Sequence, residues 1–257
     1  MLTATKTTTG CTVDIDVPAP FCFCPPINDP VVAVPDYTIC DGDPFPTFTA
    51  TIEPQTTLGT NTVDWYDAAS GGNLVQSGSL TFTPTVAGTY YAEGRNLLSS
   101  CLSDNRIPVT LTINPLPNPG ITGDLEICEG ESTTLTAEGG VSYVWNTTET
   151  TAAITVNPAV TTTYTVTATD ANGCSNTASV EVIVNPNPTA ELVGNPLVCE
   201  GESTTLTATG AGAGGSYAWS TGATTAEVTV FPIGTETYMV TVTDANGCTD
   251  VASLPAN

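Results

Sequence analysis

The sequence contains no histidine and almost no basic residues. Its 257 residues include 26 acidic side chains against only Lys6, Arg95 and Arg106, which gives a net charge of −23. Without histidine, the usual Ser-His-Asp and Cys-His catalytic arrangements are excluded. Without a basic patch, nothing in the chain can neutralise phosphate groups, so we expect neither nucleic acid nor an anionic membrane surface as a partner.

Strong helix formers and long apolar runs are also scarce. No segment approaches the ~20 apolar residues that a membrane-spanning helix needs, so we expect no membrane insertion. What dominates instead is threonine, alternating with apolar residues in short runs that Gly, Pro and Asn interrupt. This pattern is typical of short strands and predicts an all-β protein.

An internal repeat of 71 residues organises the chain. The string ICEGESTTLTA at 127–137 recurs as VCEGESTTLTA at 198–208, and TYTVTATDANGC at 163–174 recurs as TYMVTVTDANGC at 237–248. A more divergent copy begins with ICDGDPFPTFTAT at 39–51. Each copy has the same order of parts: a cysteine, an acidic turn, a strand, a Trp strand, a Tyr strand, a turn and a second cysteine.

The strand pattern predicts tandem Ig-like β-sandwiches joined by short Pro-rich linkers. In the second copy, Leu135 and Ala137 alternate with threonine, so one face of the strand is apolar. We expect about seven strands in each sandwich. The predicted segments are a terminal hairpin or strand at 1–18, a Pro- and Cys-rich linker at 19–35, and repeats at 36–114, 121–186 and 190–257, the last with an incomplete final strand.

Aromatic residues recur at fixed places in the repeats. One set falls on the central strand of each sandwich and the other on the penultimate strand, where a tyrosine corner can form. Because sandwiches this small need large buried side chains, we expect core packing rather than ligand stacking. These residues are Trp65, Trp145, Trp219, Tyr90, Tyr164 and Tyr238.

Nine cysteines in a chain so poor in lysine indicate an oxidising compartment, so we expect an extracellular or cell-surface protein. The start lacks a basic, apolar signal peptide, which fits a processed or excised piece of a larger secreted protein. The repeat suggests one disulfide in each domain, worth about 4 kcal/mol in the chain-entropy model. The expected pairs are Cys40–Cys101, Cys128–Cys174, Cys199–Cys248, and Cys11 with Cys22 or Cys24.

Acidic residues cluster in two kinds of turn, which makes calcium the one cofactor to consider. The C-[DE]-G-[DE] turns and the TDANGC turns carry carboxylates that a Ca²⁺ ion could bring together, although the full calcium loop of an EF-hand is absent. Solvated turn residues are the simpler reading. The candidate ligands are Asp41, Asp43, Glu129, Glu131, Glu200, Glu202, Asp170 and Asp244.

The two ends of the chain match parts of a repeat. Around Cys11, residues 2–17 correspond to the last hairpin of a repeat, whereas the third repeat has no counterpart of VEVIVNP after Cys248. One explanation is a window cut from a longer array. The other is that residues 12–18 of one molecule complete the third domain of the next by strand addition, which gives head-to-tail polymerisation.

The strings ICEGESTTLTA, YVWN and TTTYTVTATDANGCSNTASVEVIVNPNP resemble the Ig-like and PKD-like repeats of very large surface proteins of Bacteroidota. The resemblance is close in the second and third repeats and loose in the first. It implies an adhesin or surface filament exported by type IX secretion, and it carries over no catalytic residues. This chain departs from a complete member because it shows neither a signal peptide nor a C-terminal sorting domain.

Three functions compete on these observations. The first is an extracellular structural or adhesive fibre segment, whose partners are itself or other segments of the same array. The second is a calcium-dependent or glycan-binding adhesion module, with loops such as AGAGGS at 211–216 contacting a glycan or another cell surface. The third, a glycosidase-type carboxylate pair, is disfavoured because the acids lie in repeated turns; we therefore expect no enzyme.

Overall fold

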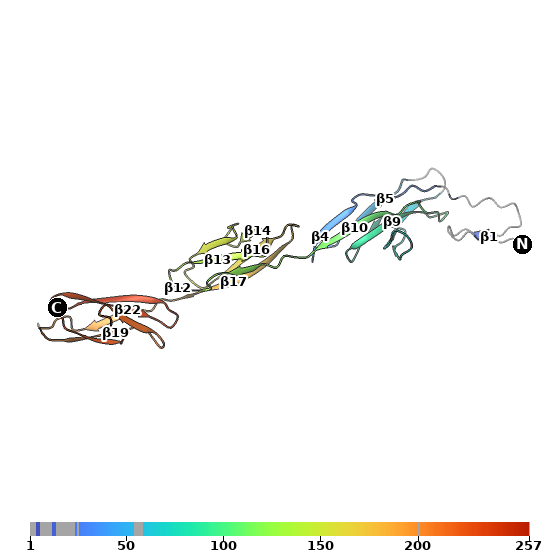
Figure 1. Cartoon of the computed structure of the whole chain (residues 1–257). Coiled ribbons are helices and arrows are strands. Elements are labelled where there is room, and N and C mark those ends of the chain that lie inside the picture. Colours follow the sequence, from blue (N-terminus) through green and yellow to red (C-terminus); the bar gives the residue numbers. More distant parts are fainter. Residues whose placement is uncertain are drawn as a thin grey trace. The chain divides into compact units, whose positions relative to one another are not determined.

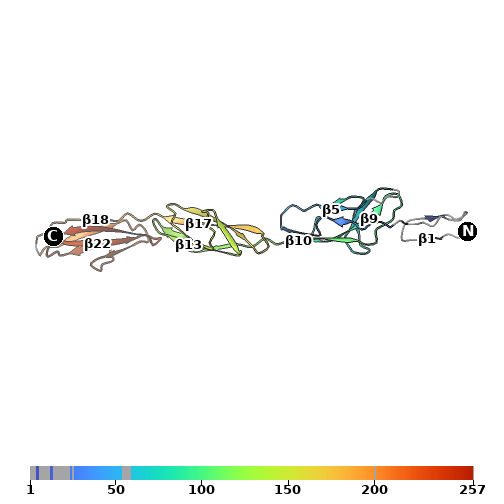
Figure 2. The same cartoon turned by 90° about the horizontal axis from the view of Figure 1, so that it is seen from above.

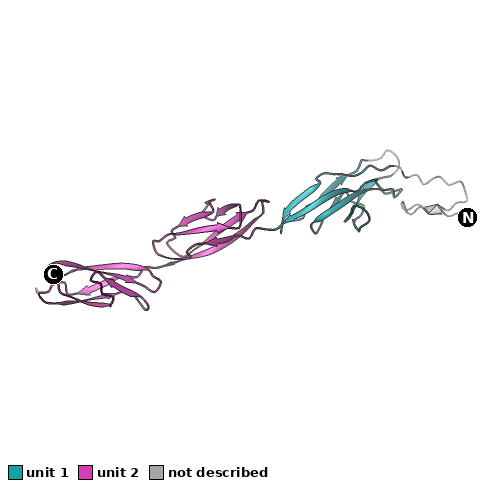
Figure 3. Ribbon diagram, viewed as in Figure 1, with its two compact units in different colours: residues 1–116 teal, residues 117–257 magenta. Residues whose placement is uncertain are grey.

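The computed structural model describes residues 4–5, 12–13, 24, 26–53, 59–199 and 201–256, and every regular element in these ranges is a β-strand. The chain divides into two compact units, residues 1–116 and 117–257 (Figure 3). The first unit holds one β-sandwich and the second holds two (Figures 1 and 2). None of the described ranges forms a helix that could cross a membrane. The predicted all-β class with tandem Ig-like sandwiches is confirmed.

The first sandwich combines a five-stranded sheet, ordered β4-β10-β9-β6-β7, with a three-stranded sheet, ordered β3-β5-β8. Strand β4 pairs with β10 in parallel, and the other pairs are antiparallel. Its strands are β3 (Val31–Val32), β4 (Asp36–Cys40), β5 (Phe48–Thr51), β6 (Asn61–Tyr66), β7 (Leu74–Gln76), β8 (Thr81–Phe82), β9 (Gly88–Asn96) and β10 (Ile107–Asn114). Strand β3 lies in the segment predicted as a linker, so the sandwich begins upstream of residue 36. A separate pair, β1 (Ala4–Thr5) with β2 (Thr12–Val13), lies earlier in the chain.

The second sandwich packs the sheet β11-β13-β15 against the sheet β12-β17-β16-β14. Its strands are β11 (Gly120–Thr122), β12 (Glu126–Cys128), β13 (Thr133–Glu138), β14 (Ser142–Trp145), β15 (Ala153–Val156), β16 (Thr162–Thr169) and β17 (Ser175–Asn185). Strand β13 buries Thr133, Leu135 and Ala137 and exposes Thr134, Thr136 and Glu138. This alternation follows from the two-residue period of a strand with one face on the core.

The third sandwich repeats this plan with the sheets β18-β19-β21 and β20-β22-β23. Its strands are β18 (Glu191–Gly194), β19 (Thr204–Thr209), β20 (Ser216–Trp219), β21 (Glu227–Val230), β22 (Glu236–Thr243) and β23 (Thr249–Ala256). In the second sandwich β12 pairs in parallel with the end of β17. In the third, residues 197–199 occupy the sequence position of β12 but form no strand.

Each of the three cores is built around one tryptophan. Trp65, Trp145 and Trp219 are at most 5% exposed. Each indole Nε1–H donates to a backbone carbonyl further along the chain: that of Ser79, after β7, for Trp65, and those of Thr151 and Thr225, in the turns that follow the Trp strands, for the other two. A buried indole N–H needs such a partner, so the same hydrogen bond recurs in all three repeats. Tyr90, Tyr164 and Tyr238 are also buried, on β9, β16 and β22.

Candidate functional site: the cysteine turns at the ends of the sandwiches

The C-[DE]-G-[DE] turns are tied together by their own carboxylates. The carboxylate of Asp43 accepts a hydrogen bond from the backbone N–H of Cys40 at 2.9 Å, and Glu131 accepts one from Cys128 N–H at 3.0 Å. The reverse backbone bonds, from Asp43 N–H and Glu131 N–H to the cysteine carbonyls, are 3.0 Å long. The acidic residue three positions after each cysteine therefore fixes the turn on which that cysteine is presented.

The TDANGC turns use their aspartates in a similar way. Asp170 Oδ1 accepts hydrogen bonds from Asn172 N–H and Cys174 N–H, at 2.8 and 2.9 Å. Asp244 repeats both bonds with Asn246 and Cys248. The glycine before each cysteine has a positive φ near +85°, a conformation that glycine adopts at no steric cost. Both turns thus present a cysteine at the start of the last strand of a sandwich.

A disulfide joins one kind of turn to the other across two sandwiches. Cys128, at the end of β12 in the second sandwich, is bonded to Cys248, at the start of β23 in the third. Nearby, the Asn187 amide in the linker donates to the carbonyl of Glu129 at 3.2 Å. The junction between these sandwiches therefore has two covalent connections, the peptide linker and the disulfide.

The predicted pairing of cysteines within each repeat is wrong. Cys128 and Cys174 lie at opposite ends of β17, because Cys128 is opposite Asn185 in the parallel register and Cys174 precedes Ser175. The 11 residues of β17 span about 36 Å of extended strand, whereas a disulfide needs α-carbons within about 7 Å. The two cysteines of this repeat therefore lie at opposite ends of one sandwich, too far apart to form a disulfide.

The other predicted pairs are excluded by position or by the bonds that their cysteines form. Cys40 lies opposite Asn114 at the end of β10, and Cys101 precedes the start of that strand. Cys101 is bonded instead to Cys24, which also excludes a Cys11–Cys24 bond. Cys248 is bonded to Cys128, so it cannot pair with Cys199. Cys40 and Cys174 are both disulfide-bonded, and the predicted Cys11–Cys22 alternative lies outside the described residues.

Cys199 has a free and exposed thiol. In the repeat it corresponds to Cys128, which carries the bridge to the following sandwich. The backbone turn is also the same, since Glu202 N–H donates to the Cys199 carbonyl at 2.9 Å. The third sandwich therefore presents, at its C-terminal end, the same cysteine turn that the second sandwich uses for its bridge.

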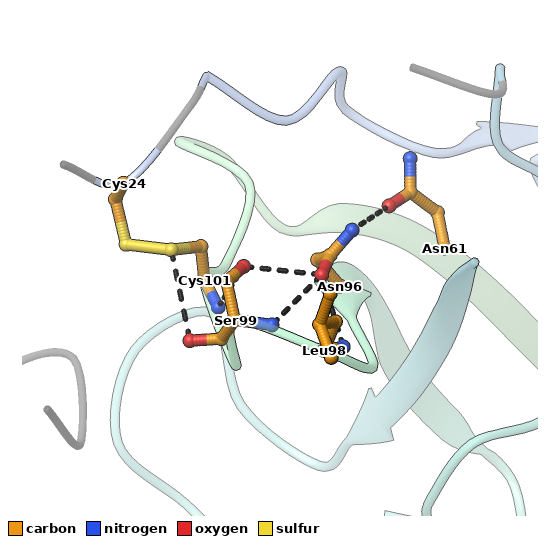
Figure 4. The surroundings of a disulfide bond; sticks show 6 residues. All are labelled: Cys24, Asn61, Asn96, Leu98, Ser99 and Cys101. Atoms are coloured by element: carbon orange, nitrogen blue, oxygen red, sulfur yellow. Dashed lines mark hydrogen bonds between the residues drawn. A yellow bond between two sulfur atoms is a disulfide. The ribbon is translucent and has the colours of Figure 1, made fainter. Parts of the chain in front are cut away.

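The turn that carries Cys101 is held by a buried asparagine instead of an aspartate (Figure 4). Asn96 is 2% exposed, and its Oδ1 accepts hydrogen bonds from Leu98 N–H, Ser99 N–H and the Ser99 hydroxyl, at 2.9 to 3.1 Å. Its amide donates to Asn61 Oδ1 at 2.9 Å. One side chain therefore links the cysteine turn to the start of β6.

Replacing Asn96 by alanine should destabilise the first sandwich by about 1–3 kcal/mol, because three donors and one acceptor lose a buried partner. The measurement is denaturant unfolding followed by the fluorescence of Trp65. Asn172→Ala, at an exposed turn position in the second sandwich, is the matched control and should cost about 0.5 kcal/mol or less. Equal effects of the two substitutions would show that the Asn96 network contributes nothing.

The first sandwich also buries two acidic residues, and the sequence analysis missed both. Asp64 on β6 forms an ion pair with Arg95, with 2.7 Å between Arg95 Nε and Asp64 Oδ2. Asp64 Oδ1 also accepts hydrogen bonds from the Ser77 hydroxyl and Gly78 N–H. A buried charge is tolerated only with such partners. The signal available in the sequence was an aspartate inside the strand-like string VDWY, in a repeat that contains both arginines.

A second buried pair joins Glu93 to Arg106. Arg106 Nε lies 3.2 Å from Glu93 Oε1, and the guanidinium carbon stands 3.5 Å from the centre of the Tyr66 ring. Burial raises the pKa of Tyr66, and the negative charge of Glu93 raises it further. Arg106 also donates to the carbonyls of Ala68 and Gly71. Both arginines thus pair with buried acidic residues of the first sandwich.

The calcium candidates are not gathered into one site. Asp43, Glu131, Asp170 and Asp244 each accept hydrogen bonds from the backbone of their own turn. Asp41, Glu129 and Glu202 lie exposed on the same kind of turn, and Glu200 lies outside the described residues. In the part of the chain that the structure describes, no three His, Cys, Asp or Glu residues are grouped as metal ligands.

An open hollow of about 770 Å³ lies on the first sandwich, beside β7, β8 and the start of β9. Its lining includes the aromatic rings of Phe82 and Tyr90 and the polar side chains of Asp67, Gln76 and Thr81. Hydrogen bonds from Asn73 hold the pKa of Asp67 below its usual value. The lining thus combines edges of the aromatic core with hydrogen-bonding side chains.

Several known structures align with much of this chain at low sequence identity and low TM-score. Immunoglobulin domains 1–5 of Sidekick-1 are 14% identical over 90% of this chain and 59% of that chain, with a TM-score of 0.35. Extracellular domains 3–5 of Drosophila OTK are 14% identical over 93% of this chain and 97% of that chain, with a TM-score of 0.33. SGBP-B of the Bacteroides ovatus mixed-linkage glucan utilization locus is 15% identical over 90% of this chain and 71% of that chain, with a TM-score of 0.22. The chain thus spans less than two thirds of the Sidekick-1 structure, and these similarities concern the fold alone.

Family comparison gives a more specific result for the first sandwich. A search of curated proteins found no match. Ig-like sandwiches are typical of structural and adhesion domains without enzymatic activity, and the disulfides indicate an extracellular or secreted protein. Residues 28–115 match the family described as "Ig-like domain CHU_C associated", which points to Ig-like domains of the Bacteroidota type.

Proposed function

We propose that this chain is a segment of an extracellular structural or adhesive fibre, made of disulfide-stapled Ig-like sandwiches that associate head to tail. The observation that carries the proposal is the Cys128–Cys248 bridge, which ties one sandwich covalently to the next. Such a bridge fixes the order and spacing of neighbouring sandwiches. A fibre needs that property, whereas a domain that binds a ligand by itself does not.

Head-to-tail association is supported by the C-terminal end of the third sandwich. Residues 197–199 form no strand there, and Leu197 is 67% exposed beside the free Cys199. The corresponding strand β12 of the second sandwich is paired with β17. An incoming strand from residues 12–18 of another molecule would supply the missing pairing partner, as in other cases of strand addition.

The test compares the full chain with a variant that lacks residues 1–18, under oxidising conditions, by sedimentation velocity and electron microscopy. We expect elongated oligomers from the full chain and none from the deletion variant. Cys199→Ser separates the two kinds of link, because strand addition survives the loss of that thiol. Filaments that persist after the deletion would refute strand addition. A compact chain that does not associate at all would refute the fibre.

A second candidate function is a calcium-dependent or glycan-binding adhesion module. The hollow on the first sandwich favours the glycan form of this proposal, because its lining includes side chains such as Asp67 and Gln76 that can hydrogen-bond to sugar hydroxyls. Calorimetric titration with Ca²⁺ and with a panel of glycans distinguishes the candidates. Glycan binding that is lost in the Gln76→Ala variant would support the adhesion module. If neither Ca²⁺ nor any glycan gives a binding heat, the adhesion module is refuted and the fibre proposal is favoured.

A further inference from the structure

The two described disulfides follow one another along the chain without overlapping. The first bridge closes residues 24–101, and the second closes residues 128–248. The shortest covalent route from Cys24 to Cys248 therefore crosses both bridges and uses only the backbone of residues 101–128. Cys40 and Cys174 are disulfide-bonded as well, and a further bridge can only shorten a covalent route. This connectivity determines how the chain responds to a pulling force.

We propose that the protein is a tension-bearing connector whose extension is limited by its disulfides. A force applied at the two ends of the chain is carried by the shortest covalent route once that route is taut. Residues inside a closed loop then add nothing to the extension, whether they are folded or not. The loops contain all three core tryptophans, Trp65, Trp145 and Trp219, and the linker between the second and third sandwiches.

The cross-sandwich pairing is what gives this protection. If each sandwich closed its own disulfide, the linkers and terminal strands would remain on the route, because the bridges would not span them. The bridge from Cys128 to Cys248 instead spans the linker, so the shortest covalent route bypasses that junction. The inference goes beyond the fibre proposal, because it holds for a single chain that does not assemble.

The backbone that does carry the force contains β10, β11 and β12. Strand β10 is the best anchored of the three, since it lies between β4 and β9 in its sheet and buries Val109 and Leu111, each 1% exposed. Strands β11 and β12 are short and lie at sheet edges. We therefore expect β11 and β12 to detach first and β10 to give the last force peak.

The oxidised and the reduced chain should differ greatly in maximum extension. At about 3.5 Å per extended residue, residues 101–128 can contribute about 95 Å, whereas the fully reduced segment from Cys24 to Cys248 can reach about 780 Å. The oxidised segment is therefore limited to about one eighth of the reduced length. Pairing within each sandwich would allow roughly 240 Å by the same measure, so the measured length also distinguishes the two arrangements.

The experiment is single-molecule force spectroscopy on the full chain held at its two ends, first oxidised and then with a thiol reductant. We expect an increase of about 690 Å in final extension on reduction. The Cys128→Ser variant should extend beyond the oxidised limit without reductant, and Cys199→Ser should match the unsubstituted chain. An oxidised chain that extends as far as the reduced one, or a Cys128→Ser variant that keeps the oxidised limit, would overturn the proposal. Fibre assembly has no part in this readout, so the two proposals fail separately.

Discussion

Replacing Cys128 by serine should lower the stability of residues 117–257 by up to about 5 kcal/mol, the value that the chain-entropy model gives for a loop of about 100 residues or more. The loop that this bridge closes has a sequence separation of 120 and contains most of both sandwiches. Without it, either sandwich can unfold while the other stays folded. Guanidinium unfolding, followed by the fluorescence of Trp145 and Trp219, measures the loss and shows whether one transition becomes two.

The repeat supplies a matched control for this substitution. Cys199→Ser makes the same chemical change at the corresponding position, where the thiol is free and exposed, and should leave the free energy of unfolding within about 0.5 kcal/mol. Cys248→Ser should reproduce the Cys128→Ser loss, and the double variant should add nothing further. If Cys174→Ser rather than Cys248→Ser matched Cys128→Ser, the bridge across the sandwiches would be refuted.

The second large effect is expected at the centre of the second core. Trp145→Ala should destabilise that sandwich by about 3–5 kcal/mol, the usual loss for a large aromatic side chain in a core. Trp145 is 2% exposed and packs in the cluster that includes Leu135 and Val166. Its Nε1–H also donates to the Thr151 carbonyl at 2.9 Å, a bond that alanine cannot make.

The neighbouring residue provides the comparison. Val144 points to the other face of β14 and is 54% exposed, so Val144→Ala should change stability by about 0.5 kcal/mol or less. Thermal unfolding by circular dichroism measures both variants in the oxidised protein. Equal melting temperatures for the two variants would mean that the tryptophan does not hold the core.

The strands and the cores could be predicted because their signals are local. Alternation of threonine with apolar residues determines which face of a strand is buried, as in β13, where Leu135 lies inside and Thr134 outside. The recurring tryptophans mark the same core position in each repeat, and all three are buried. These features depend on neighbouring residues and on the period of the strand, which the sequence displays directly.

The disulfides could not be predicted in the same way, because pairing depends on which end of a sandwich each cysteine occupies. The repeat places Cys128 and Cys174 in one domain, but their separation is set by the length of β17 and by the parallel register of β12. The sequence analysis did not predict the parallel pairing of β12 with β17. The buried charges Asp64 and Glu93 were missed for a related reason, since their arginine partners come from other strands or from the loop before β10.

Mapping the native disulfides tests the central claim most directly. Cleavage after glutamate separates the four cysteines of the second unit, because Cys128 falls in 127–129, Cys174 in 150–181, Cys199 in 192–200 and Cys248 in 237–257. Mass spectrometry of the unreduced digest should show 127–129 joined to 237–257 and a free thiol in 192–200. A peptide pair that joins 127–129 to 150–181, or 192–200 to 237–257, would contradict the account.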